Sequence, residues 1–174
     1  DGGRKRIRVI DNGRGMSRPD ASLAVRRHAT SKIRDEKDLS AIGTLGFRGE
    51  ALPSIASVSR FTLTTRTVET NIGTQLRIEG GDQKEIGDAG CPTGTTMDIA
   101  DLFYNVPARR NFLKSDFVEL RHIIDSFTRI ALSYPNIEFN LIHNEEELFY
   151  LKKSNLRRRI SSIFGRKIDE NLIP

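Results

Sequence analysis

The chain has 174 residues, of which 28 are Lys or Arg and 23 are Asp or Glu, giving a formal net charge of +5. Hydrophobic residues make up 37% of it and charged residues 29%, which excludes a disordered chain and predicts one folded domain. No apolar run approaches the ~20 residues of a membrane span. The single cysteine, Cys91, excludes an internal disulfide framework and is typical of a cytoplasmic protein.

A strand and a helix are predicted at the start of the chain. Basic and apolar residues alternate over 4–10, which is strand periodicity, and this pattern would turn Ile7 and Val9 toward a core. Ser17 precedes a proline and an acidic residue within three positions, so we expect it to cap a helix that continues to about residue 28.

The stretch 30–50 carries Ser, Thr, Gly and charged residues without steady periodicity, which is typical of a functional loop. A short helix should follow over 50–58. Because a proline disfavours the helical conformation at the residue before it, we expect this helix to begin at Pro53. Alternating β-branched residues predict three strands, with a glycine turn after the second, at 61–68, 74–79 and 95–99.

The remainder of the chain should form a long helix, a hairpin of two strands and a last helix ended by Gly165. These elements are expected at 116–132, 137–142, 148–151 and 156–164. Phe117 would pack in the core, and the arginines at 157–159 would lie on a solvated helix face, with contact to phosphate as the alternative. Helices with mostly antiparallel strands predict an α+β fold, a two-layer α/β sandwich with a mixed, mostly antiparallel sheet.

The run DNGRG at residues 11–15 follows the first strand and allows two interpretations. Asn-Gly after a strand is a common signal for a tight turn. Alternatively, Asp11 at the strand end accepts hydrogen bonds only, which suits an amino-bearing base such as adenine. Gly13 and Gly15 would then let a flat ring approach the backbone.

A second run, GTLGFRGEAL at residues 43–52, places three glycines ahead of a helix start. Such a loop exposes backbone N–H groups, the helix N-terminus adds partial positive charge, and Arg48 adds donors, all of which suit phosphate. No lysine with a hydroxyl residue follows the last glycine, which excludes a P-loop. The alternative is a flexible loop, with Glu50 simply favoured in a first helical turn.

Two other segments carry weaker signals. Residues 27–33, RHATSKI, suit either a nucleotide's phosphates or the exit of a helix, and the three histidines of the chain lack metal-ligand spacing. Residues 101–114 mix aromatics and cations, which permits nucleic-acid binding. We expect their apolar side chains to anchor the core around a proline bend. These anchors are Leu102, Phe103, Phe112 and Leu113.

The order of the motifs is more specific than any one of them. It closely resembles the N-terminal ATPase region of the MutL family of DNA mismatch repair proteins, over about residues 5–145. The runs that carry the resemblance are DNGRGM at 11–16, RHATSKI at 27–33, LGFRGEAL at 45–52, GTT at 94–96 and LFYNVPARR at 102–110. This family belongs to the GHKL superfamily, which holds an adenine nucleotide between a β-sheet and a helical layer. The resemblance implies the GHKL (Bergerat) type of α/β sandwich.

The resemblance also assigns roles. Asp11 would bind the adenine amino group, with Gly13 and Gly15 beside it and Thr95 supporting the base through water. The residues around the phosphates would be Gly46, Phe47, Arg48, Gly49, Glu50, Ala51 and Leu52, and those of a mobile lid over ATP would be Thr30, Ser31 and Lys32.

In the family, ATP binding promotes homodimerisation into a clamp around DNA, and hydrolysis reopens it. The cycle times a signal from a MutS-like mismatch sensor to a downstream endonuclease or helicase. The implied cofactors are ATP and Mg²⁺. The family's general-base Glu and magnesium-coordinating Asn lie on a helix upstream of the first motif, and only ten residues precede Asp11. We therefore expect both upstream of Asp1.

The expected organisation is an incomplete ATPase domain at 1–150 and a connecting helix at 151–174 toward a second domain. By itself this stretch is expected to bind ATP poorly and not to hydrolyse it. Two other functions stay open: a non-hydrolysing DNA-binding module with a basic surface, and another GHKL ATPase such as a topoisomerase subunit. The run at 103–110 argues against the topoisomerase.

Overall fold

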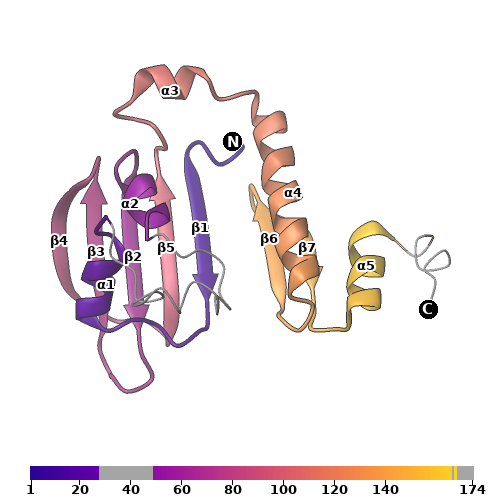
Figure 1. The fold of residues 1–174 in the computed structure, drawn as a ribbon, viewed down its shortest axis with the longest axis horizontal. Coiled ribbons are helices and arrows are strands. Elements are labelled where there is room, and N and C mark those ends of the chain that lie inside the picture. Colours follow the sequence, from indigo (N-terminus) through magenta and orange to yellow (C-terminus); the bar gives the residue numbers. More distant parts are fainter. Residues whose placement is uncertain (28–48, 166, 168–174) are drawn as a thin grey trace, which may run out of the picture. The chain divides into compact units, whose positions relative to one another are not determined.

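The computed structural model describes residues 1–27, 49–165 and 167 of the chain (Figure 1). It divides into two compact units, one formed by Gly3–Leu113 and the other by Asp1–Gly2 with the residues from Lys114 onward. This division, between residues 113 and 114, separates two groups of elements by the contacts within each group. The expected boundary between an ATPase domain and a connecting helix after residue 150 is a different division, and it stays a prediction.

The first unit is a sheet of five antiparallel strands in the order β1-β5-β2-β3-β4. The strands are β1 (Arg6–Asp11), β2 (Arg60–Arg66), β3 (Gly73–Glu79), β4 (Asp82–Ala89) and β5 (Gly94–Ala100). The helices of this unit are α1 (Arg18–Ala24), α2 (Ala51–Ala56) and α3 (Pro107–Asn111). Figure 1 shows α1 and α2 on one face of the sheet, so the unit has two layers.

Apolar side chains cover the face of the sheet that meets the helices. Because the strands are in register, these side chains form rows that cross the sheet. One row is Ile7, Ile99, Phe61 and Ile78, and the next is Val9, Met97, Leu63, Leu76 and Ile86. In these two rows, the side chains on β2 and β3 are at most 4% exposed. Each contributes about 1.5–3 kcal/mol to stability through its burial. The helices add Ala21 and Ala56 to the same core.

The helices of the first unit begin where local chemistry allows. Ser17 caps α1 as predicted, because its Oγ accepts from the Asp20 N–H at 3.3 Å. The expected start of α2 at Pro53 is wrong, since the helix begins at Ala51. A proline in the first turn lacks an N–H that has no helical partner there anyway, so the helix tolerates it.

Three other expectations about the sheet unit need correction. Helix α1 ends at Ala24, short of the expected residue 28. Strand β4 was not predicted, because its sequence DQKEIGDA is charged and contains glycine. It lies at an edge of the sheet, where charged residues prevent pairing with another chain. Val9 faces the core side but is 53% exposed, since β1 is the opposite edge and has one neighbouring strand.

The second unit contains a long helix, a hairpin and a last helix, as predicted. These are α4 (Asp116–Ser133), β6 (Phe139–His143), β7 (Glu146–Leu151) and α5 (Leu156–Phe164). Phe127 of α4 packs against Phe139 and Phe149 of the hairpin, with ring centroids 6.0 and 5.6 Å apart. Gly165 ends α5 with a φ of 89°, a conformation that favours glycine.

The expectation that the arginines at 157–159 are all solvated is wrong for Arg159, which is fully buried. Its Nη2 donates to the carbonyl oxygens of Pro135, Ile137 and Lys152, at 2.9, 2.6 and 3.0 Å. The guanidinium also lies over the Phe139 ring, 5.5 Å from its centroid. Burial lowers the pKa of Arg159. The residue therefore ties α5 to the segments that flank the hairpin, through hydrogen bonds to their backbone carbonyls.

Two phenylalanines expected in the core are exposed. Phe112, after α3, is 82% exposed, and Phe117, in the first turn of α4, is 76% exposed. Leu102 does pack against the core of the sheet unit, as expected. Among the described residues, no helix is both long and apolar enough to cross a lipid bilayer.

Candidate functional site

A polar row replaces the apolar rows at one end of the sheet. It consists of Asp11, Thr95, Thr65, Thr74 and Asp88, taken from β1 across to β4, and each is the register partner of the next. Side chains two residues apart on a strand share a face, so the row continues the core face. The three threonines are at most 7% exposed, and the two aspartates at the ends are exposed.

Thr65 is the hydrogen-bonding centre of this polar row. Its Oγ1 accepts from the Met16 N–H at 2.9 Å, donates to the Gly94 carbonyl oxygen at 3.0 Å, and lies 3.2 Å from the Thr95 Oγ1. The turn between β1 and α1 is thereby attached to the ends of β2 and β5. A buried hydroxyl without partners would be destabilising, and these bonds prevent that.

Asp11 forms the turn that the Asn-Gly signal predicts. Its Oδ1 accepts from the Gly13 N–H at 2.9 Å, which is an Asx turn. The residue is nevertheless exposed and stands beside Thr95 in register. The two interpretations of this run are therefore compatible, because one carboxylate oxygen accepts a hydrogen bond within the turn while the side chain stays exposed at the strand end.

Two glycines permit a close approach of backbone to backbone at the same place. A Cβ on Gly15, whose φ is +69°, would lie 2.0 Å from the Arg66 carbonyl oxygen. A Cβ on Gly94, whose φ is +120°, would lie 2.1 Å from the Asp11 carbonyl oxygen. Only glycine fits either position, so these residues are needed to assemble the site whether or not a ring approaches them.

The expected phosphate-binding residues are described only in part. Gly49 has a φ of +65°, and Glu50 occupies the N-cap position of α2, where its carbonyl accepts from the Ser54 N–H at 3.1 Å. Ala51 opens the helix, and Leu52 packs against the core that ends in the polar row. The remaining expected residues lie outside the described part of the chain: Thr30, Ser31, Lys32, Gly46, Phe47 and Arg48.

The structure thus brings Asp11, Gly13, Gly15 and Thr95 together, and it adds Thr65, which the sequence analysis missed. A threonine within a strand of alternating β-branched residues gives no separate signal. The only indication was its position, where the alternation would otherwise place an apolar residue.

An open hollow of about 220 Å³ adjoins the row on its β3 side, between Met16, Ile72 and Thr74. Within the described ranges, no group of three or more His, Cys, Asp or Glu residues is placed to hold a metal ion. The described part of the site therefore offers hydrogen-bonding groups and an acceptor carboxylate, which suits an organic ligand with donor groups.

No family model matches the chain. It is 50% identical over 174 residues to the DNA mismatch repair protein MutL of Christiangramia forsetii, and 51% identical to that of Flavobacterium psychrophilum. The whole chain is covered in both cases, but it spans about 28% of the length of these curated relatives.

Solved structures with the same fold agree with these relatives. The Aquifex aeolicus MutL ATPase domain complexed with ADP matches with a TM-score of 0.72 and 32% identity, over 92% of this chain and 57% of that one. The N-terminal domain of a DNA repair protein matches with a TM-score of 0.74 and 28% identity, over 95% and 50%. The similarity to the MutL N-terminal ATPase region and the GHKL type of α+β fold are therefore confirmed.

Proposed function

We propose that the chain is the ATP-binding core of a MutL-like DNA mismatch repair protein. The observation that carries the proposal is the adjacency of Asp11 and Thr95 at the polar end of a sheet whose fold matches a MutL ATPase domain complexed with ADP. The carboxylate of Asp11 accepts from the amino group of adenine, and Thr95 supports the base through water. A carboxylate cannot donate, so it selects a base edge that does.

The remaining roles follow the motifs. The residues 46–52 surround the phosphates, with backbone N–H groups and Arg48 compensating their charge, while 30–32 belong to the lid. Mg²⁺ is the metal of the proposed site, and the domain division after residue 150 is part of the same proposal. When bound, Mg²⁺ supplies charge neutralisation at the phosphates.

For the full-length protein, we propose ATP hydrolysis, homodimerisation on ATP binding and closure around DNA. Its partners are a MutS-like mismatch sensor and a downstream endonuclease or helicase, and its location is the cytoplasm. The support is the identity of about 50% to MutL proteins. These 174 residues alone do not turn over ATP, and a segment that hydrolyses it at the rate of the full-length protein would contradict that.

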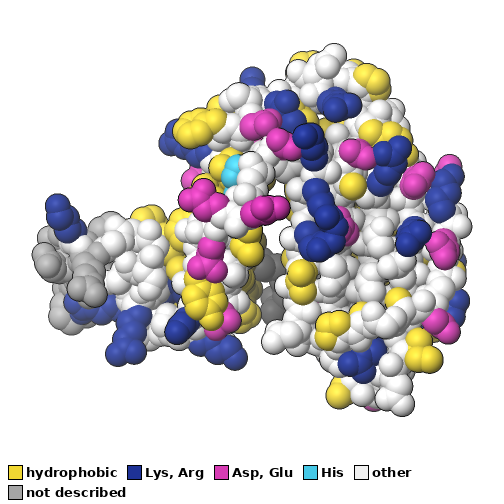
Figure 2. Space-filling view, turned by 180° about the vertical axis from the view of Figure 1, so that it is seen from behind, with side chains coloured by type: hydrophobic (Ala, Val, Ile, Leu, Met, Phe, Trp, Pro, Cys, Tyr) yellow, Lys and Arg dark blue, Asp and Glu magenta, His cyan; other side chains and the backbone are white. Residues whose placement is uncertain are grey.

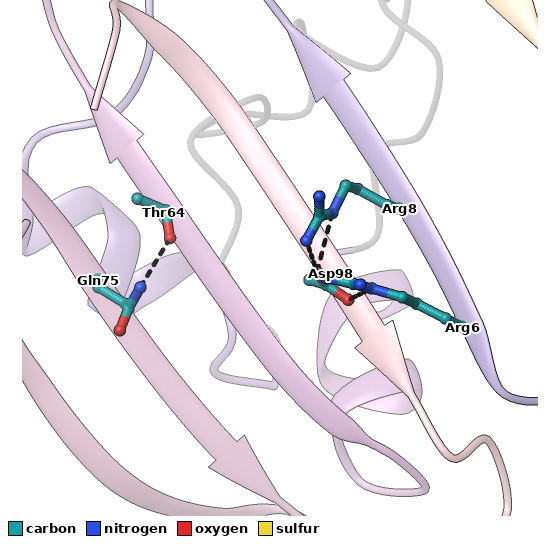
Figure 3. A network of polar contacts seen from close by, with 5 residues as sticks. All are labelled: Arg6, Arg8, Thr64, Gln75 and Asp98. Carbon is teal, nitrogen blue, oxygen red and sulfur yellow. Dashed lines mark hydrogen bonds and ion pairs between the residues drawn. The ribbon is translucent and has the colours of Figure 1, made fainter. Parts of the chain in front are cut away.

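The alternative function is a DNA-binding module that acts through a basic surface. The outer face of the sheet argues against it, because the arginines there are paired with a carboxylate. On this face Arg6 and Arg8 both form ion pairs with Asp98, and the Arg8 Nη2 lies 2.7 Å from the Asp98 Oδ2. Figure 3 shows the two guanidiniums converging on that carboxylate. In Figure 2, cationic and anionic side chains are interspersed over this face. A surface that binds DNA phosphates presents unpaired positive charge.

Calorimetric titration of the full-length protein with ATP and with GTP tests the proposal. Because the 6-oxo group of guanine is an acceptor that faces the acceptor Asp11, we expect ATP to bind at least about tenfold more tightly. Equal affinities, or no binding of ATP, would contradict the nucleotide site. Steeply salt-dependent binding to DNA in the absence of ATP binding would favour the alternative.

A further inference from the structure

We infer that Thr65 is a positioning residue that orients the hydroxyl of Thr95 so that it acts only as a hydrogen-bond acceptor toward the bound base. The inference rests on the proposed function, because it concerns the ligand of the same site. It assigns a role in base selection to a residue that is itself fully buried.

The direction of the hydrogen bonds follows from the partners of Thr65. A backbone N–H only donates and a carbonyl oxygen only accepts. The Met16 N–H therefore gives its hydrogen to Thr65 Oγ1 at 2.9 Å, and Gly94 O, at 3.0 Å, receives a hydrogen from it. A hydroxyl has one hydrogen and two lone pairs, so one lone pair is left for the third partner.

That third partner is Thr95, whose Oγ1 lies 3.2 Å from the Thr65 Oγ1. Since the hydrogen of Thr65 is committed to Gly94, the hydrogen between the two threonines comes from Thr95. All three contacts of Thr65 are then satisfied at once, which matters because the Thr65 side chain is fully buried.

The direction of this hydrogen bond determines what the Thr95 hydroxyl can offer to a ligand. With its hydrogen directed toward Thr65, the Thr95 oxygen offers only lone pairs to a base or a bridging water. Asp11, its register partner on β1, is likewise an acceptor. Two neighbouring acceptors, met directly or through a water that donates to both of them, favour a ligand edge that donates, such as an amino group, and disfavour one that presents a carbonyl oxygen.

Loss of the Thr65 hydroxyl would release this constraint. Thr95 would then rotate freely and donate as well as accept, so its contribution to selection would be lost. A residue with a purely structural role would weaken the binding of all nucleotides by the same factor. The ratio of affinities for a 6-amino and a 6-oxo purine therefore separates positioning from packing.

The test uses full-length protein carrying Thr65→Val, which keeps the shape and removes the hydroxyl, with Thr65→Ser as the conservative rescue. Thr62→Val is the matched control, because Thr62 lies on the same strand with its side chain on the opposite face. Dissociation constants are measured for ATP and for ITP, which carries a 6-oxo group, and the melting temperature is recorded for each variant.

We expect Thr65→Val to weaken the binding of ATP about tenfold and to leave the binding of ITP nearly unchanged. The ratio of the two affinities should then fall by the same factor. Thr65→Ser should restore the preference and Thr62→Val should not change it. Should the valine variant not fold, Thr65→Cys, with a weak donor in the same place, gives the same comparison with a smaller fall.

An unchanged ratio, with both nucleotides weakened equally or only the melting temperature lowered, would overturn the inference while leaving the proposed function intact. Wild-type protein that binds neither nucleotide would overturn both. The two failures are therefore distinguishable in one set of titrations.

Discussion

The hydroxyl oxygens of Thr65 and Thr95 lie 3.2 Å apart on neighbouring strands, in a row of polar side chains at the end of the apolar sheet face. Apolar residues in these two positions would extend the core and avoid the desolvation of two hydroxyls. The sheet instead places a hydrogen-bonded pair beside the Asp11 carboxylate. The polar row is consistent with the proposed nucleotide site, in which Asp11 and Thr95 meet the base.

Gly15→Ala should destabilise the fold by about 2–4 kcal/mol, because the new Cβ would lie 2.0 Å from the Arg66 carbonyl oxygen at a positive φ. Gly87→Ala is the matched control, since a Cβ there meets no atom within 4 Å. Urea unfolding checks both variants. Equal free energies of unfolding for the two would show that the turn does not approach β2 as described.

Arg159→Met should lower the free energy of unfolding by about 1–3 kcal/mol, because it removes the guanidinium that donates to the carbonyls of Pro135, Ile137 and Lys152. The exposed Arg158 is the control, and Arg158→Met should change stability by no more than about 0.5 kcal/mol. Thermal unfolding at neutral pH measures both. A stable Arg159→Met protein would mean that the buried guanidinium is dispensable.

Asp98→Ala should destabilise the sheet unit by about 1 kcal/mol, because it leaves Arg6 and Arg8 as like charges on one face without their shared partner. The effect should shrink in 1 M NaCl, where exposed charges are screened. Asp82→Ala, which removes an 82% exposed carboxylate paired with Lys84 at 3.6 Å, is expected to be nearly neutral. An effect of Asp98→Ala that does not depend on salt would contradict an electrostatic origin.

Features governed by neighbours in sequence were predictable from the chain alone. The Ser17 cap, the hairpin of β6 and β7 and the end of α5 at Gly165 all depend on side chains within a few residues. The motif order also predicted the fold, because several short runs in one sequence are far more specific than any single run.

Features governed by tertiary contacts were not predictable. Arg159 was predicted to be solvated because its sequence neighbours are arginines. The carbonyls that accept its hydrogen bonds instead come from segments up to 24 residues away. Phe117 fits the apolar stripe of α4 but is exposed. Within the site, Asp11 and Thr95 were expected, whereas the link through Thr65 depends on the register of three strands.

The most direct test of the nucleotide site is ATP binding by full-length Asp11→Asn protein, compared with Asp88→Asn. An asparagine at position 11 keeps an oxygen to accept from the Gly13 N–H, so the turn survives, but it places a donor where the adenine amino group needs an acceptor. Asp88 is the other aspartate of the polar row, on β4, and its ion pair with Arg18 is exposed. We expect Asp11→Asn to weaken the binding of ATP about 10- to 100-fold and Asp88→Asn to bind ATP like wild type. Wild-type affinity for ATP in the Asp11→Asn protein would contradict the nucleotide site.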